Sequence, residues 1–219
     1  MIMQLKQVKN YLVDMDGVIL DIKYDHFFWK EHMPLIYAKK NNLSLEQSKR
    51  ILHQIFHYKI KNRDWYNLDY WSNMIGIDVL REKKKQTNMD KISLNNGAIE
   101  FLKILKKENK KIFLITNAYK KTLDLKMSKF PLEKYFDDMI CSHELNYVKE
   151  ELPFWYMLKK KLNISYDKTV LVEDTYDNIK SASLAGITNF IYISEKCCPE
   201  TKFNIIKIKS LAEISSALE

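Results

Sequence analysis

Short apolar runs that each end in polar residues recur along this chain, and they constrain its fold more than any other feature. The first, Tyr11–Val13, leads directly into Asp14. Four later runs have the same form: Ile112–Ile115, Met139–Ile140, Val170–Val172 and Phe190–Ile193. Short continuous apolar runs are typical of strands buried on both faces, as in a parallel sheet.

Segments with helical spacing of apolar residues separate these runs. The clearest are Ala98–Lys107, Leu152–Leu162 and Asn178–Ala185. Strands that alternate with helices of this length predict a parallel sheet with helices on both faces. We therefore expect an α/β protein with a Rossmann-like parallel sheet as its core.

The interval from Asp21 to Lys91 departs from this alternation. It contains helical patterns, many aromatic residues and no convincing strand run. An excursion of this length is too long for a loop and predicts a separate domain. We expect a core domain formed by residues 1–20 and 93–219, and an inserted all-helical domain formed by residues 21–92.

Composition limits the functional classes. The 219 residues, 46% of them apolar, are sufficient for one core and a modest insertion. No apolar run is long enough to cross a bilayer and the first residues lack a secretory pattern, so we expect a cytoplasmic protein without a membrane partner. The formal charge of +8 is compatible with nucleic-acid binding, but the lysines are scattered and no recognition module accompanies them. We expect no nucleic-acid partner.

Carboxylates follow two of the predicted strands. Asp14 and Asp16 follow the first, and Gly17 permits a sharp turn. Glu173 and Asp174 end the fourth. Because the carboxyl ends of parallel strands meet at one edge of the sheet, these acids are expected to converge there. Acids this close are stabilised by a hard cation, which predicts a Mg²⁺ site.

Two further polar sites complete the pattern. Thr116 and Asn117 end the second strand with a hydroxyl and backbone amides suited to phosphate oxygens, and Lys149 precedes a helix and can supply a fixed positive charge. Each signal alone has a simpler explanation, such as a turn, a helix cap or a solvated side chain. Their shared position at strand ends or helix starts favours a functional site.

These residues resemble the four motifs of the haloacid dehalogenase superfamily. The matching segments are Val13–Val18, Leu114–Asn117, Lys149 and Val172–Thr175, in the order of the family and spanning nearly the whole chain. The inserted segment resembles the family's helical cap in position. Two departures are visible, because Glu173 replaces a common Asp and Pro153 falls later after the lysine than usual.

The insertion carries a more specific likeness. Segments such as Asp25–Trp29, Asp64–Ser72 and Tyr147–Glu150 resemble the bacterial GMP/IMP 5'-nucleotidases of this superfamily. The resemblance implies a small phosphorylated substrate, a nucleoside monophosphate. Stacking of a purine on an aromatic side chain is physically reasonable. The candidate rings are those of Phe28, Trp29, Trp65 and Tyr70.

The resemblance also implies roles for the motif residues. Asp14 is then the nucleophile and Asp16 the general acid and base. Thr116, Asn117 and Lys149 bind the phosphate oxygens. The implied ligands of Mg²⁺ are Asp14, Asp16 through its backbone carbonyl, Asp174, and Glu173 through a water.

Two other interpretations stay open. The first is a sugar-phosphate phosphatase or phosphoglucomutase-like enzyme with the same chemistry. The second is a basic nucleic-acid-binding protein that keeps the fold as a scaffold, against which the intact acid set argues. A monomer and a homodimer are equally compatible with the sequence.

Overall fold

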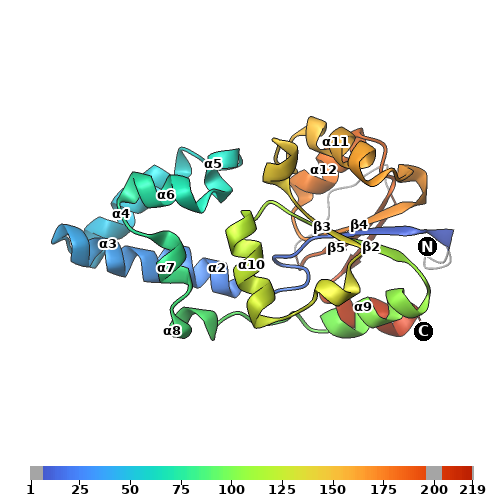
Figure 1. Cartoon of the computed structure of the whole chain (residues 1–219), viewed down its shortest axis with the longest axis horizontal. Helices are drawn as coiled ribbons and strands as arrows, with labels where there is room; N and C mark the ends of the chain where they lie inside the picture. Colours follow the sequence, from blue (N-terminus) through green and yellow to red (C-terminus); the bar gives the residue numbers. More distant parts are fainter. Residues whose placement is uncertain (1–6, 196–203, 219) are drawn as a thin grey trace. The chain divides into compact units, whose positions relative to one another are not determined.

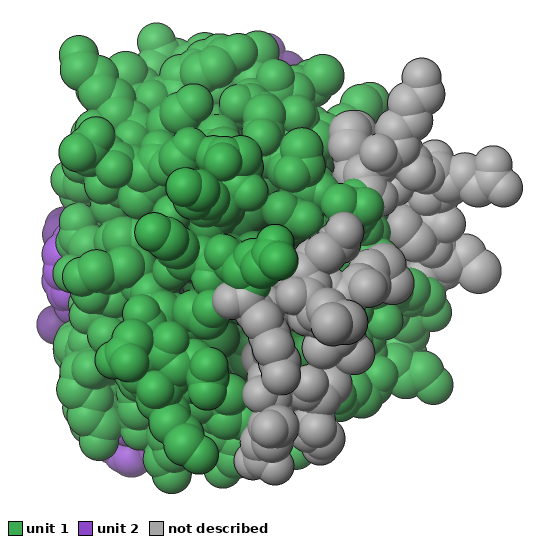
Figure 2. All heavy atoms as spheres, turned by 90° about the vertical axis from the view of Figure 1, so that its right-hand side faces the viewer, with its two compact units in different colours: residues 1–21, 94–117, 131–219 green, residues 22–93, 118–130 purple. Residues whose placement is uncertain are grey.

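The computed structural model describes residues 7–195 and 204–218 (Figure 1). Contacts divide the chain into two compact units, which Figure 2 distinguishes by colour. Unit 1 comprises Met1–Asp21, Leu94–Asn117 and Pro131–Glu219. Unit 2 comprises Ile22–Ser93 and Ala118–Phe130.

Unit 1 is built on a parallel sheet whose strand order is β3-β2-β1-β4-β5-β6. The strands are β1 (Asn10–Val13), β2 (Lys111–Thr116), β3 (Asp138–Cys141), β4 (Thr169–Glu173), β5 (Asn189–Ile193) and β6 (Asn204–Ile208). Leu12 of β1 is in register with Phe113 on one side and Leu171 on the other. The central strands are buried on both faces, as their apolar runs predict, so the expected α/β parallel-sheet core is confirmed.

Strand β6 was not predicted from the sequence. This edge strand pairs only with β5 among the described residues, and its pattern is mostly exposed or half-buried. Lys207 interrupts its isoleucines, so no continuous apolar run marks it. An edge strand tolerates such a residue because one of its sides faces solvent.

Helices cover both faces of this sheet. Figure 1 shows α9 (Ala98–Lys107) and α13 (Leu211–Leu218) on one face, with α11 (Leu152–Leu162) and α12 (Tyr176–Leu184) on the other. Short 3₁₀ helices lie in the connections: η2 (Glu133–Tyr135), η3 (Ser142–Leu145) and η4 (Tyr166–Lys168). Phe154, Trp155 and Leu158 of α11 are fully buried and pack with Leu12 and Leu171 of the sheet in one apolar cluster. This packing fixes α11 against the central strands.

The described residues of unit 2 form helices joined by turns and short loops, with no β-strand among them. Its helices are α2 (Lys23–Phe27), the π-helix η1 (Phe28–His32), α3 (Met33–Asn41), α4 (Leu45–His57), α5 (Arg63–Tyr66), α6 (Leu68–Ile75), α7 (Val79–Lys83), α8 (Gln86–Met89) and α10 (Lys120–Lys129). Phe28, Leu52, Trp71 and Val79 form the centre of its own apolar core. Among the described helices of the chain, none is long and apolar enough to cross a membrane.

Apart from shifts of one residue at its boundaries, unit 2 differs from the expected inserted domain because it also contains residues 118–130. We expected this segment in the core domain, whereas its contacts belong to unit 2. Lys126 of α10 donates to Asp25 at 2.5 Å, and the hydroxyl of Tyr119 donates to Asp69 at 3.2 Å. Asp25 also accepts from Lys83 at 3.0 Å. Burial would raise the pKa of Asp25, but the two ammonium groups outweigh it and hold that pKa well below its usual range.

Candidate active site

The strand order of unit 1 creates a natural binding position at the carboxyl end of β1. This strand lies between β2 and β4, so the chain winds outward from it in both directions. Ligands of open α/β sheets bind outside the carboxyl ends of the strands at such a switch point. Asp14 follows β1, Thr116 ends β2 and Glu173 ends β4. The sheet therefore brings three of the predicted site residues to the same edge.

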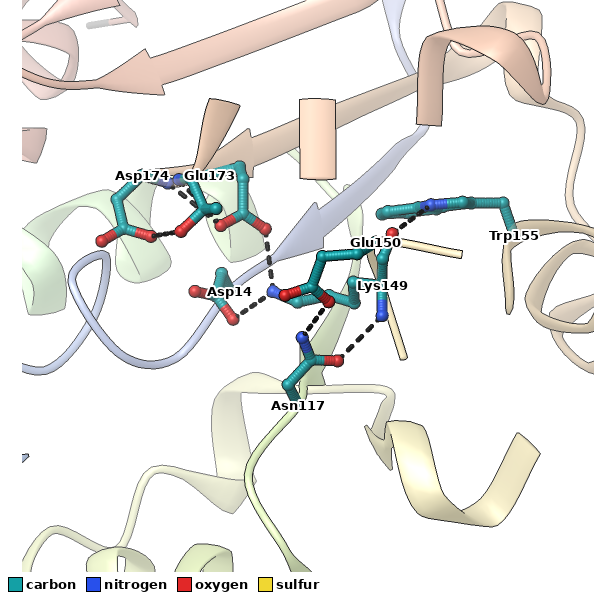
Figure 3. A network of polar contacts seen from close by, with 8 residues as sticks. Asp14, Asn117, Lys149, Glu150, Trp155, Glu173 and Asp174 are labelled. Atoms are coloured by element: carbon teal, nitrogen blue, oxygen red, sulfur yellow. Dashed lines mark hydrogen bonds and ion pairs between the residues drawn. The ribbon is translucent and has the colours of Figure 1, made fainter. Parts of the chain in front are cut away.

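Three carboxylates converge at this edge. Oxygen atoms of Asp14, Glu173 and Asp174 all lie within 4.8 Å of one another, an arrangement able to hold a metal ion (Figure 3). Asp14 is 6% exposed and Glu173 is completely buried. The backbone N–H groups of Asp174 and Thr175 donate to Glu173 Oε1 at 3.2 and 3.1 Å, which fixes that carboxylate at the start of α12. The predicted convergence of acids from β1 and β4 is thus present in the structure.

Lys149 lies within the same group of charges. Its ammonium donates to Asp14 at 2.5 Å and to Glu173 at 2.8 Å (Figure 3). The residue is 2% exposed, so these contacts occur in a medium that screens charge weakly. One ammonium balances one of the three carboxylates. With all three carboxylates ionised, the site has an excess of negative charge that a divalent cation can neutralise.

The titration of these groups reflects that excess. Burial raises the pKa of Asp14 well above its usual range, Glu173 raises it further, and Lys149 opposes both. Burial and the neighbouring Glu173 raise the pKa of Asp174 to about 8. Burial acts to lower the pKa of Lys149, but Asp14 and Glu173 outweigh it and raise the pKa above its usual range. Without a cation, Asp174 thus favours the protonated form at neutral pH.

Gly17 allows Asp174 to occupy its position. The backbone of Gly17 has φ +86°, which side chains other than glycine rarely adopt. A Cβ atom there would lie 2.0 Å from Asp174 Oδ2. The glycine after Asp16 therefore serves the site in two ways, because it turns the chain and leaves room for a carboxylate from β4.

Asp16 and Thr116 complete the predicted phosphate-handling set. Asp16 is half-buried in the turn after β1, and its carboxylate is not one of the three that form the metal-competent group among the described residues. That the backbone carbonyl of Asp16 binds the cation therefore stays a prediction. Thr116 is the last residue of β2 and is 2% exposed.

Asn117 has a structural role that its sequence position did not indicate. We expected its backbone amide to bind phosphate. Its side chain accepts from the backbone N–H of Lys149 at 2.9 Å and donates to Glu150 at 2.7 Å (Figure 3). It thereby ties the end of β2 to the loop that carries the lysine.

The four aromatic candidates all lie in the core of unit 2. Phe28 is completely buried, whereas Trp29, Trp65 and Tyr70 are half-buried. Phe28 and Trp29 meet edge to face with ring centres 5.2 Å apart. The ammonium of Lys83 lies 4.3 Å from the centre of the Phe28 ring, so this ring already packs on both an aromatic group and a cation. Base contact by any of the four stays a prediction.

Sequence reasoning missed two residues that support the lysine loop, Glu150 and Trp155. The indole N–H of Trp155 donates to the backbone carbonyl of Lys149 at 2.8 Å (Figure 3). In the sequence Trp155 is one apolar residue of a helical pattern, and Glu150 belongs to the segment Tyr147–Glu150 without a role of its own. No local signal distinguishes these contacts.

Comparison with known proteins agrees with this arrangement. Residues 8–186 match the family described as haloacid dehalogenase-like hydrolase. The chain is 28% identical over 183 residues to the GMP/IMP nucleotidase YrfG of Escherichia coli, covering 83% of this chain and 81% of that protein. It is 27% identical over 108 residues to the phosphorylated carbohydrates phosphatase of Thermotoga maritima, covering 49% and 50%.

Solved structures share the fold. The crystal structure of a HAD phosphatase from Thermococcus onnurineus superposes with a TM-score of 0.81 at 19% identity, covering 96% of this chain and 97% of that one. The family match extends from the strand before Asp14 to the helix after Asp174, so it includes the whole constellation described above. The chain belongs to the haloacid dehalogenase-like hydrolase family.

Proposed function

We propose that this protein is a Mg²⁺-dependent phosphatase that hydrolyses nucleoside 5'-monophosphates, with GMP and IMP as its substrates. One observation carries the proposal: three carboxylates at the ends of β1 and β4 converge at the carboxyl edge of the sheet, and the buried ammonium of Lys149 pairs with two of them, Asp14 and Glu173. A nucleophilic oxygen and a phosphate-binding cation are thereby available in one place.

Magnesium fits this donor set because Mg²⁺ prefers hard oxygen ligands, usually one or two carboxylates with water. The carboxylates of Asp14 and Asp174 and the backbone carbonyl of Asp16 would hold it, with Glu173 acting through a water. The raised pKa values of Asp14 and Asp174 support a resident cation, since a cation offsets the burial and mutual repulsion that raise them. When bound, the ion offsets the repulsion between an anionic nucleophile and an anionic phosphate.

Asp14 supplies the nucleophile. One of its carboxylate oxygens forms a bond to phosphorus while the bond from phosphorus to the substrate's ester oxygen breaks, which gives an aspartyl-phosphate and an alcohol. Asp16 donates a proton to the departing oxygen. It then accepts a proton from the water that hydrolyses the aspartyl-phosphate, so one carboxyl group serves as acid and then as base. Phosphate leaves and Asp14 is restored.

The phosphoryl oxygens need fixed partners as charge shifts in the transition state. Lys149 provides a buried positive charge beside Asp14, and Thr116 provides a hydroxyl at the end of the neighbouring strand. The backbone N–H of Asn117 is the third donor. Such preorganised donors contribute most of the catalysis in phosphoryl transfer, since the protein's main tasks are positioning and charge stabilisation.

The choice of nucleotides rests on similarity to the E. coli GMP/IMP nucleotidase and on the aromatic core of unit 2. Trp29, Trp65 and Tyr70 keep exposed ring surface on which a purine could stack. A sugar phosphate is the second candidate, because a shorter match links the chain to a phosphorylated carbohydrates phosphatase.

A phosphate-release screen tests the proposal. Purified protein is incubated with GMP, IMP, AMP, UMP, glucose 6-phosphate and glucose 1-phosphate, each with Mg²⁺ and with EDTA. The proposal expects GMP and IMP to have the highest kcat/KM and EDTA to abolish turnover. Efficient turnover of the sugar phosphates alone would replace the nucleotidase with the second candidate. Turnover that persists in EDTA would contradict the metal requirement.

A further inference from the structure

Lys149 lies in a turn between η3 and α11, where no regular element fixes its backbone. The turn is closed by the N–H of Glu151, which donates to the carbonyl of Val148 at 2.9 Å. The first proline after the lysine is Pro153, four residues later and already in α11. Position 150 carries a glutamate, so the residue after the lysine does not have the fixed φ that a proline would supply.

Side chains hold both polar groups of the Lys149 backbone. The N–H donates to Asn117 Oδ1 at 2.9 Å, and the carbonyl accepts from the indole N–H of Trp155 at 2.8 Å (Figure 3). Asn117 is held in turn by Glu150, which accepts from its amide at 2.7 Å. We call Asn117, Glu150 and Trp155 the lysine clamp. It draws on three parts of unit 1: the end of β2, the turn itself and α11.

Trp155 is the rigid member of this clamp. Its side chain is completely buried in the apolar cluster beneath the sheet, and its ring meets Phe154 edge to face at 5.0 Å. Its backbone carbonyl, which does not set the orientation of the indole ring, accepts from the hydroxyl of Tyr166. The indole N–H is therefore aimed at Lys149 by a ring that cannot readily turn, because packed interiors leave large side chains few alternatives.

We propose that Trp155 is a positioning residue for Lys149, which acts through its indole N–H on the backbone carbonyl of that lysine. The inference rests on the proposed function, because Lys149 contacts a phosphoryl group only in that reaction. The ammonium must reach Asp14 and Glu173 at 2.5 and 2.8 Å, so a shift of the backbone moves it directly out of place. A misplacement of about 1 Å in such a site can cost roughly 10²-fold in rate.

The direct test is Trp155→Phe, which keeps an aromatic ring in the cluster, removes the N–H and leaves a small cavity. The matched control is Tyr166→Phe, which removes a buried hydroxyl bonded to the same helix and leaves the bond from Trp155 to Lys149 intact. Both variants lose one buried hydrogen bond, so a general loss of stability affects both. Activity is measured as kcat and KM on the best substrate of the screen, and Tm is measured for each protein.

We expect Trp155→Phe to lower kcat at least about tenfold with KM changed less than about threefold. Tyr166→Phe should keep kcat within about twofold, and its Tm gives the stability lost with one buried hydrogen bond. Trp155→Phe with a wild-type kcat would overturn the proposal. So would an equal loss of kcat in both variants, since that result means that stability alone is responsible.

A binding measurement separates failure of this inference from failure of the proposed function. Mg²⁺ and inorganic phosphate together should raise the Tm of the wild type and of Tyr166→Phe, and should raise that of Trp155→Phe much less. If the wild type hydrolyses no phosphate ester, the proposed function fails. The Tm gain on adding Mg²⁺ and phosphate then tests by itself whether Trp155 positions Lys149. An equal gain in all three proteins would reject that role. If Trp155→Phe does not fold, Glu150→Ala takes its place, and an unchanged kcat in that variant refutes the clamp.

Discussion

Asp14 is the residue on which the chemistry depends. Asp14→Asn replaces the attacking oxygen with an amide of the same shape, so we expect turnover to fall by about 10³-fold or more. The fold should persist, because burial and the adjacent Glu173 already disfavour a charged Asp14. Phosphate release and Tm are the measurements. Asp138→Asn, the same change at an exposed residue of β3, is the control and should remain active. Substantial activity in Asp14→Asn would remove the aspartyl-phosphate from the mechanism.

Gly17 leads to a second prediction about a single residue. In Gly17→Ala the new methyl group would meet Asp174 Oδ2 at 2.0 Å, so the carboxylate must leave its position. We expect Mg²⁺ to bind at least about tenfold more weakly, because one of its hard ligands is displaced. Titration of the metal by calorimetry measures this change.

Gly186→Ala is the matched control for Gly17→Ala. Gly186 has a comparable positive φ of +103°, but an added Cβ meets nothing within 4 Å. Both variants carry the backbone strain, typically about 1 kcal/mol, and only one carries the contact with Asp174. Equal metal affinity in the two variants would show that Asp174 is not held against Gly17.

At the scale of elements, much of unit 1 follows from the sequence. Strands β1, β2 and β4 lie where apolar runs mark them, since a strand buried on both faces must be apolar along its length. The acids at their ends converge because parallel strands share a carboxyl edge. Edge strand β6 and helix α10 were not predicted. Strand β6 lacks an apolar run that would mark it. Helix α10 belongs to unit 2 because of tertiary contacts, such as the ion pair from Lys126 to Asp25, which the sequence does not reveal.

The supporting contacts of the site could not be predicted in this way. The bond from Trp155 to the Lys149 carbonyl depends on where α11 packs against the sheet, which hydrophobic periodicity does not specify. Likewise, the pairing of Asn117 with Glu150 joins residues 33 positions apart in the chain. Sequence patterns place residues on elements, whereas these contacts arise from tertiary packing.

The contact between helices α9 and α13 supports a prediction about stability. Gly97 begins α9 with φ +79°, and an added Cβ would lie 2.2 Å from the backbone nitrogen of Ala212 in α13. Backbone cannot yield as a side chain can, so Gly97→Ala should destabilise the fold by roughly 2–4 kcal/mol through strain and overpacking. Denaturant unfolding measures the loss. Gly186→Ala again isolates the strain alone, and an equal loss in both variants would mean that α13 does not pack closely on Gly97.

For the whole molecule, three of the lysines that contribute to the formal charge of +8 are buried. Lys83, Lys126 and Lys149 are each 2% exposed or less and are engaged in buried ion pairs. These ammonium groups are not available to a phosphate backbone. Their partners are Asp25, Asp14 and Glu173, so these pairs leave the net charge of the rest of the molecule unchanged.

Proton binding links the stability of the whole molecule to Mg²⁺. Without metal, Asp174 keeps its proton in the folded state up to about pH 8, whereas an unfolded carboxyl loses it near pH 4. The folded state then binds more protons than the unfolded state, so metal-free stability falls as the pH rises through this window. The slope for one such proton is about 1.4 kcal/mol per pH unit. A bound cation replaces the proton and removes this loss.

The gain in Tm from Mg²⁺ should therefore be larger at pH 8 than at pH 6. Thermal unfolding at the two pH values, with saturating Mg²⁺ and with EDTA, measures that difference. Asp174→Asn is the control, because the amide has no proton to release when the metal binds. The gain in Tm from Mg²⁺ in this variant should therefore depend less on pH than in the wild type. A gain that is equal at both pH values would mean that metal binding does not displace the Asp174 proton, and that the three carboxylates do not act as one cation site.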